Sequence, residues 1–163
     1  MDHEVHHGGV FILLTFIAAF ILSVIPLGET LSQFRPEWVV MVLIYWCIYL
    51  PGRIGVFYGW LTGLFLDVIY GALIGQYALA LSIVAFSCYK IQTRFRLFPN
   101  SQQSLIIILL VAVAQMVILW VKGINGQAPQ TIIYWMPSLT SALFWPLISF
   151  FLDHIRNLYG VSE

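Results

Sequence analysis

Residues 55–75, GVFYGWLTGLFLDVIYGALIG, carry a glycine or an aspartate at every fourth position: Gly55, Gly59, Gly63, Asp67, Gly71 and Gly75. In an α-helix each four-residue step turns the side-chain direction by only about 40°, so the first four of these residues share one broad side. Three glycines on one face allow a second helix to approach closely. The neighbouring residues are apolar, which makes the Asp67 carboxylate the most informative charge of the chain.

The composition of the chain indicates an integral membrane protein. Of its 163 residues, 61% are hydrophobic and 9% are charged, and the mean hydropathy is +0.92. Soluble domains carry roughly 25% charged residues. The formal net charge is zero, so no global field favours nucleic acid. We therefore expect an all-α polytopic membrane protein that does not bind nucleic acid.

Six apolar runs predict a compact bundle of six transmembrane helices over residues 10–159, after a polar cytoplasmic tail at 1–9. The runs cover residues 10–26, 38–50, 54–70, 72–89, 105–121 and 131–152. The second run is shorter than the roughly 20 residues that cross a bilayer core. Pro36, just before it, suits a first helical position, and Pro146 can kink the sixth helix. Residues 27–35, 90–104 and 122–130 are predicted to be polar connections.

The placement of Lys and Arg predicts the orientation of the bundle. With the N-terminus inside, the cytoplasmic side of a six-span chain holds Arg53, Lys90, Arg94, Arg96 and Arg156. The outer side holds only Arg35 and Lys122. Because cytoplasmic loops carry an excess of Lys and Arg, both termini are expected in the cytoplasm. A re-entrant second helix would instead place the N-terminus outside.

Asp67 lies near the outer end of the third predicted helix, where its charge needs compensation. A charge at the centre of a membrane helix costs roughly 2.5–3.5 kcal/mol, and the negative end of its own helix disfavours a carboxylate further. We expect either an Arg35–Asp67 ion pair or capping of the fourth helix by the Asp67 carboxylate. The functional alternative is a carboxylate that binds a proton or a ligand in a polar cavity. We favour a structural or partner-binding role.

Two other groups of residues have structural interpretations. The glycine face is expected to pack against another helix of the same chain, with homodimerisation as the alternative; Gly71 is expected in a tight turn. The residues assigned to helix packing and its turns are Pro36, Gly55, Gly59, Gly63, Gly71, Gly75 and Pro146. The basic cluster Lys90, Arg94 and Arg96 is expected to face lipid headgroups.

The sequence His3-Glu4-Val5-His6-His7 matches the H-E-x-x-H pattern of zinc proteases. That pattern needs a stable helix within a dry cleft and a third ligand, whereas here it precedes the first apolar run. We interpret it as a solvated tail and expect no catalytic residue, no metal and no cofactor.

Several motifs together resemble a known family. Phe34-Arg35-Pro36-Glu37-Trp38 opens a short helix that ends at Leu50-Pro51, Gly63-Leu64-Phe65-Leu66-Asp67 precedes Gly71 and Leu73-Ile74-Gly75, and Trp145-Pro146 comes late. In this order and spacing they resemble the rod shape-determining MreD family, over about residues 10–159. The matching positions are Arg35, Pro36, Asp67, Gly71, Gly75, Trp145 and Pro146.

The resemblance implies a non-enzymatic component of the bacterial inner membrane that takes part in lateral cell-wall synthesis. The implied main partner is MreC, with MreB, RodZ, RodA and an elongation-specific penicillin-binding transpeptidase in the same complex. It also implies a six-helix fold similar to the substrate-binding membrane subunits of energy-coupling-factor transporters. The short second helix and the glycine-lined third helix are the candidates for the partner-binding region, or for the packing that shapes it.

The alternative function is a small-molecule-binding membrane subunit of a transporter. Such a subunit requires an outward-facing cavity with converging polar groups. The sequence offers few residues for one: Arg35, Asp67, Gln76, Gln115 and Asn125. A sealed apolar interior would exclude this alternative.

Overall fold

The glycine-rich stretch forms helix α4 (Val56–Tyr70), a glycine turn and the start of helix α5 (Gln76–Phe95) in the computed structural model, which describes residues 5–161. Gly71, with φ +61°, ends α4. The Gly71 N–H bonds to the Val68 carbonyl and the Ala72 N–H to the Asp67 carbonyl, the two bonds of a Schellman motif. Gly75, with φ +102°, precedes α5. Both glycines occupy conformations that side chains with a Cβ rarely adopt.

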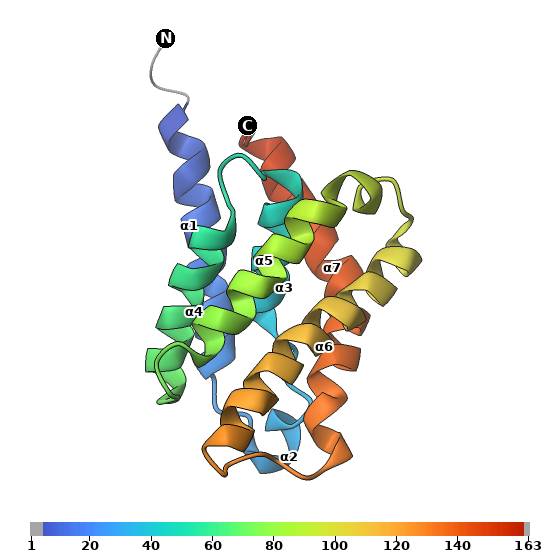
Figure 1. Ribbon diagram of the computed structural model, residues 1–163. Helices are drawn as coiled ribbons and strands as arrows, with labels where there is room; N and C mark the ends of the chain where they lie inside the picture. Colours follow the sequence, from blue (N-terminus) through green and yellow to red (C-terminus); the bar gives the residue numbers. More distant parts are fainter. Residues whose placement is uncertain (1–4, 162–163) are drawn as a thin grey trace.

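All regular elements in the described residues are helical. The other helices are α1 (Val5–Val24), α2 (Gly28–Ser32), α3 (Trp38–Tyr49), α6 (Asn100–Ile124), the 3-10 helix η1 (Ile132–Trp135) and α7 (Met136–Leu158). Helix α1 and helices α3 to α7 run between two ends of the molecule (Figure 1). The start of α1 and the end of α7 lie at one end of the bundle, and α2 and the α6–α7 connection lie at the other (Figure 1).

Helix α3 is the centre of the bundle. Every residue from Val39 to Ile48 is buried, and α3 packs against α1, α5 and α7. A helix that is apolar on all sides must be enclosed by other elements. The neighbouring helices therefore shield this short helix along its length, which accounts for an apolar run too short to span a bilayer alone.

The observed helix bounds differ from the expected ones where polar residues occupy helix ends. Helix α1 begins at Val5, within the expected tail, and α2 lies in the expected loop 27–35. Helices α5 and α6 extend through most of the expected polar connection 90–104, leaving only a short turn before Asn100. The expected sixth helix begins as η1 and continues as α7 to Leu158.

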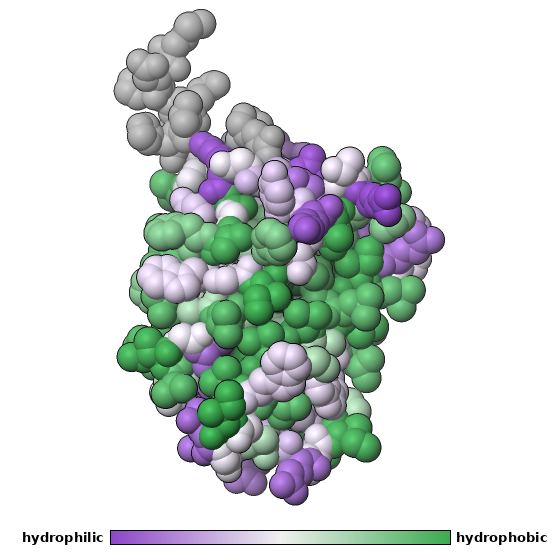
Figure 2. Space-filling view, in the orientation of Figure 1, coloured by the Kyte–Doolittle hydropathy of each residue, from purple (hydrophilic) through white to green (hydrophobic). Residues whose placement is uncertain are grey.

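The surface has the pattern of a membrane protein. Helix α6 and the segment Ile132–Leu158 are long and apolar enough to cross a membrane, and Gly8–Val24, Trp38–Tyr49 and Val56–Tyr70 are shorter apolar helices. Figure 2 shows a broad apolar band between two polar ends. Side chains such as Leu143, Val68 and Phe150 are more than 70% exposed, as expected for contact with lipid.

Candidate functional site

Asp67 lies on α4, and its carboxylate caps the next helix. Its Oδ2 accepts hydrogen bonds from the backbone N–H groups of Gly75 at 2.8 Å and Ala78 at 3.4 Å, and its Oδ1 from that of Tyr77 at 2.8 Å. The residue is only 1% exposed. The first N–H groups of a helix have no partner within it, and the positive helix end favours a carboxylate. The buried Asp67 carboxylate is thus compensated by hydrogen bonds from backbone N–H groups.

Arg35 interacts with the C-terminal end of a helix, as Asp67 does with an N-terminal end. Its guanidinium donates hydrogen bonds to the backbone carbonyls of Ser23 and Ile25, where α1 ends. A cation is favourable there because the last carbonyls of a helix are negative and lack partners. Within residues 5–161 the structure does not contain the expected Arg35–Asp67 ion pair; the ion pair it contains joins Asp153 and Arg156.

The glycines of the α4 face have different roles. A Cβ on Gly63 would lie 2.4 Å from the Ala78 Cα, and one on Gly59 would lie 2.7 Å from the Leu81 carbonyl oxygen. Both positions therefore hold α4 against the backbone of α5. A Cβ on Gly55, which precedes the helix, would meet no atom within 4 Å.

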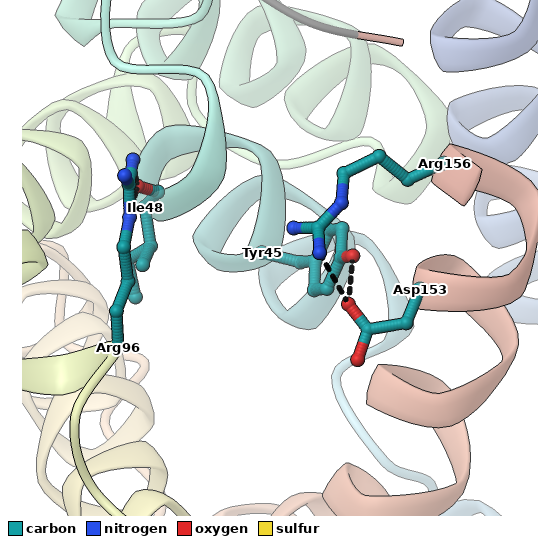
Figure 3. Close-up of polar contacts among 5 residues, drawn as sticks. All are labelled: Tyr45, Ile48, Arg96, Asp153 and Arg156. Carbon is teal, nitrogen blue, oxygen red and sulfur yellow. Dashed lines mark hydrogen bonds and ion pairs between the residues drawn. The ribbon is translucent and has the colours of Figure 1, made fainter. Parts of the chain in front are cut away.

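The basic cluster divides in the structure. The Lys90 ammonium lies 5.0 Å from the centroid of the Phe86 ring, and both Lys90 and Arg94 are exposed. The Arg96 guanidinium donates a hydrogen bond through Nε to the Ile48 carbonyl at 3.0 Å, at the end of α3 (Figure 3). Arg96 thus stabilises the C-terminus of the central helix.

A second polar contact reaches the same end of α3. The Tyr45 hydroxyl donates a hydrogen bond to Asp153 Oδ1, and Arg156 pairs with the same oxygen at 3.4 Å (Figure 3). The Arg156 guanidinium also lies 4.4 Å from the centroid of the Tyr49 ring. The sequence did not reveal this cluster, because it joins residues about a hundred positions apart and because the sixth predicted run ends at residue 152, before Asp153 and Arg156.

Trp145 of the late Trp-Pro motif is completely buried. Its indole N–H donates to Gln103 Oε1 at 3.2 Å, and Gln103 Nε2 donates to the Phe98 carbonyl at 3.1 Å. The pair therefore fixes α7 to the turn between α5 and α6. Pro146 follows inside α7, and Pro36 is buried before α3.

The polar residues considered for a ligand cavity divide into two groups. Arg35 and Asp67 serve helix ends, as described above. Gln115 lines one cavity, and Gln76 and Asn125 line a neighbouring one. Both cavities lie at the end of the bundle opposite the start of α1 and the end of α7.

Glu37, which precedes α3, also lines the first cavity. Burial raises the pKa of its carboxyl to about 7, and the charges of Lys122 and Arg35 oppose this increase.

The described residues contain no group of three or more His, Cys, Asp or Glu side chains that could hold a metal ion. His3 and Glu4 of the H-E-x-x-H match lie outside the described residues.

Comparisons with known proteins agree with the resemblance of the sequence. The family model described as rod shape-determining protein MreD matches residues 6–155. The rod shape-determining protein MreD of Haemophilus influenzae is 30% identical over 152 residues, which cover 90% of each chain. No solved structure matches the chain. With its apolar helices and a match over nearly its whole length, the chain belongs to the MreD family of rod shape-determining membrane proteins.

Proposed function

We propose that this protein is a non-enzymatic scaffold of the bacterial inner membrane that holds MreC, and through it the peptidoglycan synthases, in one complex. The observation that carries this proposal is the family match over residues 6–155. Many apolar residues of the helices are exposed, and they form a band on the face shown in Figure 2. Such helix surface is what a partner's transmembrane helix contacts. MreB, RodZ, RodA and an elongation-specific transpeptidase are the further expected members of this complex.

The proposed arrangement has six membrane spans, α1, α3, α4, α5, α6 and α7, with both termini in the cytoplasm. The start of α1 and the end of α7 lie at one end of the bundle (Figure 1), which is compatible with an even number of spans. Helices α5 and α7 end toward this end of the bundle (Figure 1), and Arg94, Arg96 and Arg156 lie where these helices end, which agrees with a cytoplasmic location.

We assign the contact with the MreC transmembrane helix to a groove between α1 and α4. The two candidates inferred from the sequence are otherwise engaged, since α3 is enclosed and the glycine face of α4 packs on α5. The remaining side of α4 forms an apolar cavity of about 580 Å³ with α1, lined by side chains such as Leu13, Phe16 and Phe65. Phe20 of α1 and Phe65 of α4 are in contact there, with their ring centroids 6.2 Å apart.

Co-purification from membranes in mild detergent tests this assignment. Leu13→Trp fills the groove from α1 and is expected to reduce the recovery of MreC severalfold at unchanged expression. The matched control is Leu143→Trp on α7, a residue that is 76% exposed and does not line the groove. Equal recovery with both variants would contradict the groove. Wild-type protein recovered without MreC or any wall-synthesis protein would contradict the scaffold itself.

A further inference from the structure

Two neighbouring cavities lie at the end of the molecule opposite the termini. One has a volume of about 250 Å³ and includes Glu37, Gln115 and Tyr134 in its wall. The other has a volume of about 340 Å³ and includes Gln76 and Asn125. Tyr77 and Lys122 belong to both walls. The cavities therefore flank the same two side chains, between the start of α5 and the end of α6.

Each cavity has a buried amide group with an unused hydrogen-bonding atom. Gln115 is 3% exposed; its Nε2 donates to the Tyr134 carbonyl at 2.9 Å, so its Oε1 is fixed as an acceptor, and that oxygen has no partner. Gln76 is 4% exposed, and its Nε2 donor has no partner. Buried polar groups are nearly always hydrogen-bonded in native proteins, so two unsatisfied ones at adjoining cavities point to a polar occupant.

The walls also contain one acidic and one basic side chain. Glu37 and Lys122 line the same cavity, yet in the described part of the chain neither is joined to another side chain by an ion pair within 4 Å. The Lys122 ammonium lies 5.9 Å from the Tyr134 ring centroid. A partly buried charge is stable when an opposite charge or hydrogen bonds compensate it. The pair is thus arranged to receive a positive and a negative group from one ligand.

We propose that the two cavities form one binding site for a small zwitterion. Its ammonium group contacts Glu37 and the Gln115 side-chain oxygen, and its anionic group contacts Lys122 and the Gln76 amide. The volumes suit a ligand of the size of an amino acid or a dipeptide. A lipid with an ethanolamine phosphate headgroup presents the same chemistry, so the source is either a free amino acid or peptide or this headgroup. The proposal does not depend on the scaffold function.

Calorimetric titration of the purified full chain in a maltoside detergent tests the site with defined probes. Alanyl-alanine is expected to bind, and N-acetyl-alanyl-alanine, which lacks the ammonium group, and alanyl-alanine amide, which lacks the carboxylate, are each expected to bind about tenfold more weakly or less. In a second arm, glycerophosphoethanolamine is compared with glycerophosphocholine, whose ammonium has no N–H donor. Binding in only one arm identifies the source of the ligand.

Two variants locate the binding. Glu37→Gln and Lys122→Met are each expected to weaken binding of the effective probe by about tenfold. The matched controls are Glu29→Gln and Arg94→Met, which remove exposed charges that line neither cavity and are expected to leave binding unchanged. Because the capped probes test the wild-type protein, the result does not depend on the variants folding. Absence of binding by both alanyl-alanine and glycerophosphoethanolamine at millimolar concentration, or equal binding by capped probes, overturns the proposal.

Discussion

At the scale of single residues, Asp67 and Arg35 show how this protein accommodates charges among apolar helices. Asp67 accepts hydrogen bonds from three backbone N–H groups at the start of α5, and Arg35 donates to two carbonyls at the end of α1. In each case the charge and the unsatisfied helix end compensate each other. Each charge therefore has backbone partners without the Arg35–Asp67 ion pair that the sequence predicts.

Replacing Asp67 by Asn tests the cap. The amide keeps one acceptor but places an NH₂ donor opposite backbone N–H groups, so at least one hydrogen bond to a charged group is lost. We expect the free energy of unfolding in detergent to fall by about 1.5–3 kcal/mol, measured by denaturant or thermal unfolding. Glu29→Gln, which removes an exposed carboxylate on α2, is the control and is expected to have no effect. An unchanged stability of Asp67→Asn would contradict the capping role.

Glu37 predicts a pH dependence of stability with a defined sign. Burial raises the pKa of its carboxyl from 4.5 to about 7, so the folded protein holds this proton more tightly than the unfolded chain does. Its contribution is most favourable below about pH 4.5 and declines as the pH rises toward 7. Glu37→Gln has no such group. As the pH rises from 4.5 to 7, the melting temperature of the wild type should therefore fall relative to that of Glu37→Gln. A difference between the two melting temperatures that does not change with pH would contradict the raised pKa.

At the scale of elements, the α4–α5 pair depends on the absence of side chains. Gly63→Ala places a methyl group 2.4 Å from the Ala78 Cα and 2.5 Å from the Ala78 nitrogen, and these backbone atoms cannot move aside without separating the helices. Overpacking of this kind typically costs about 1–3 kcal/mol. We expect a lower melting temperature and a lower membrane yield. Gly55→Ala is the matched control, since its Cβ meets no atom within 4 Å; equal effects of the two changes would contradict the packing.

The sequence predicted the helices more accurately than the residues at which they begin and end. A four-residue glycine spacing is a local property, so the helix α4 and its close contact could be inferred from it. The end of α5 could not be inferred in this way, because the charges of Lys90 and Arg94 indicate a polar connection at residues 90–104. These residues continue the helix beyond the apolar band, where their charges are exposed while Phe95 remains buried. The sequence did contain a signal for a longer helix: Lys90 and Arg94 are four residues apart, and the apolar residues Cys88 and Phe95 are seven residues apart. Both spacings place the two residues on one side of a helix.

At the scale of the whole molecule, the contacts that sequence reasoning could not find join distant segments. Tyr45 meets Asp153 and Trp145 meets Gln103, and no local pattern specifies which polar residues of separate helices will face each other. For the same reason, Gln76 and Gln115 could be noted as polar residues in apolar runs, but their approach to two adjoining cavities depends on how α5 and α6 pack.

Cysteine labelling tests the proposed orientation of the entire bundle. The native Cys47 and Cys88 are buried, so a membrane-impermeant maleimide should leave them unmodified in the folded protein. Asn125→Cys introduces a thiol at an exposed position between α6 and η1, and Gln102→Cys introduces one at an exposed position in the first turn of α6. Helix α6 starts toward the end of the bundle at which α1 begins and α7 ends (Figure 1). With cytoplasmic termini, intact spheroplasts should label only Asn125→Cys, and permeabilised cells should label both.

The two thiols lie at opposite ends of one helix, α6, which is long and apolar enough to cross a membrane. Their accessibilities are therefore coupled, and each possible result has a definite meaning. Labelling of Gln102→Cys alone in spheroplasts would reverse the orientation and place the polar cavities on the cytoplasmic side. Labelling of both would show that α6 does not cross the membrane and would contradict the six-span arrangement. The expected pattern would instead open those cavities to the outer surface, where an extracytoplasmic zwitterion or an outer-leaflet headgroup could reach Glu37 and Lys122.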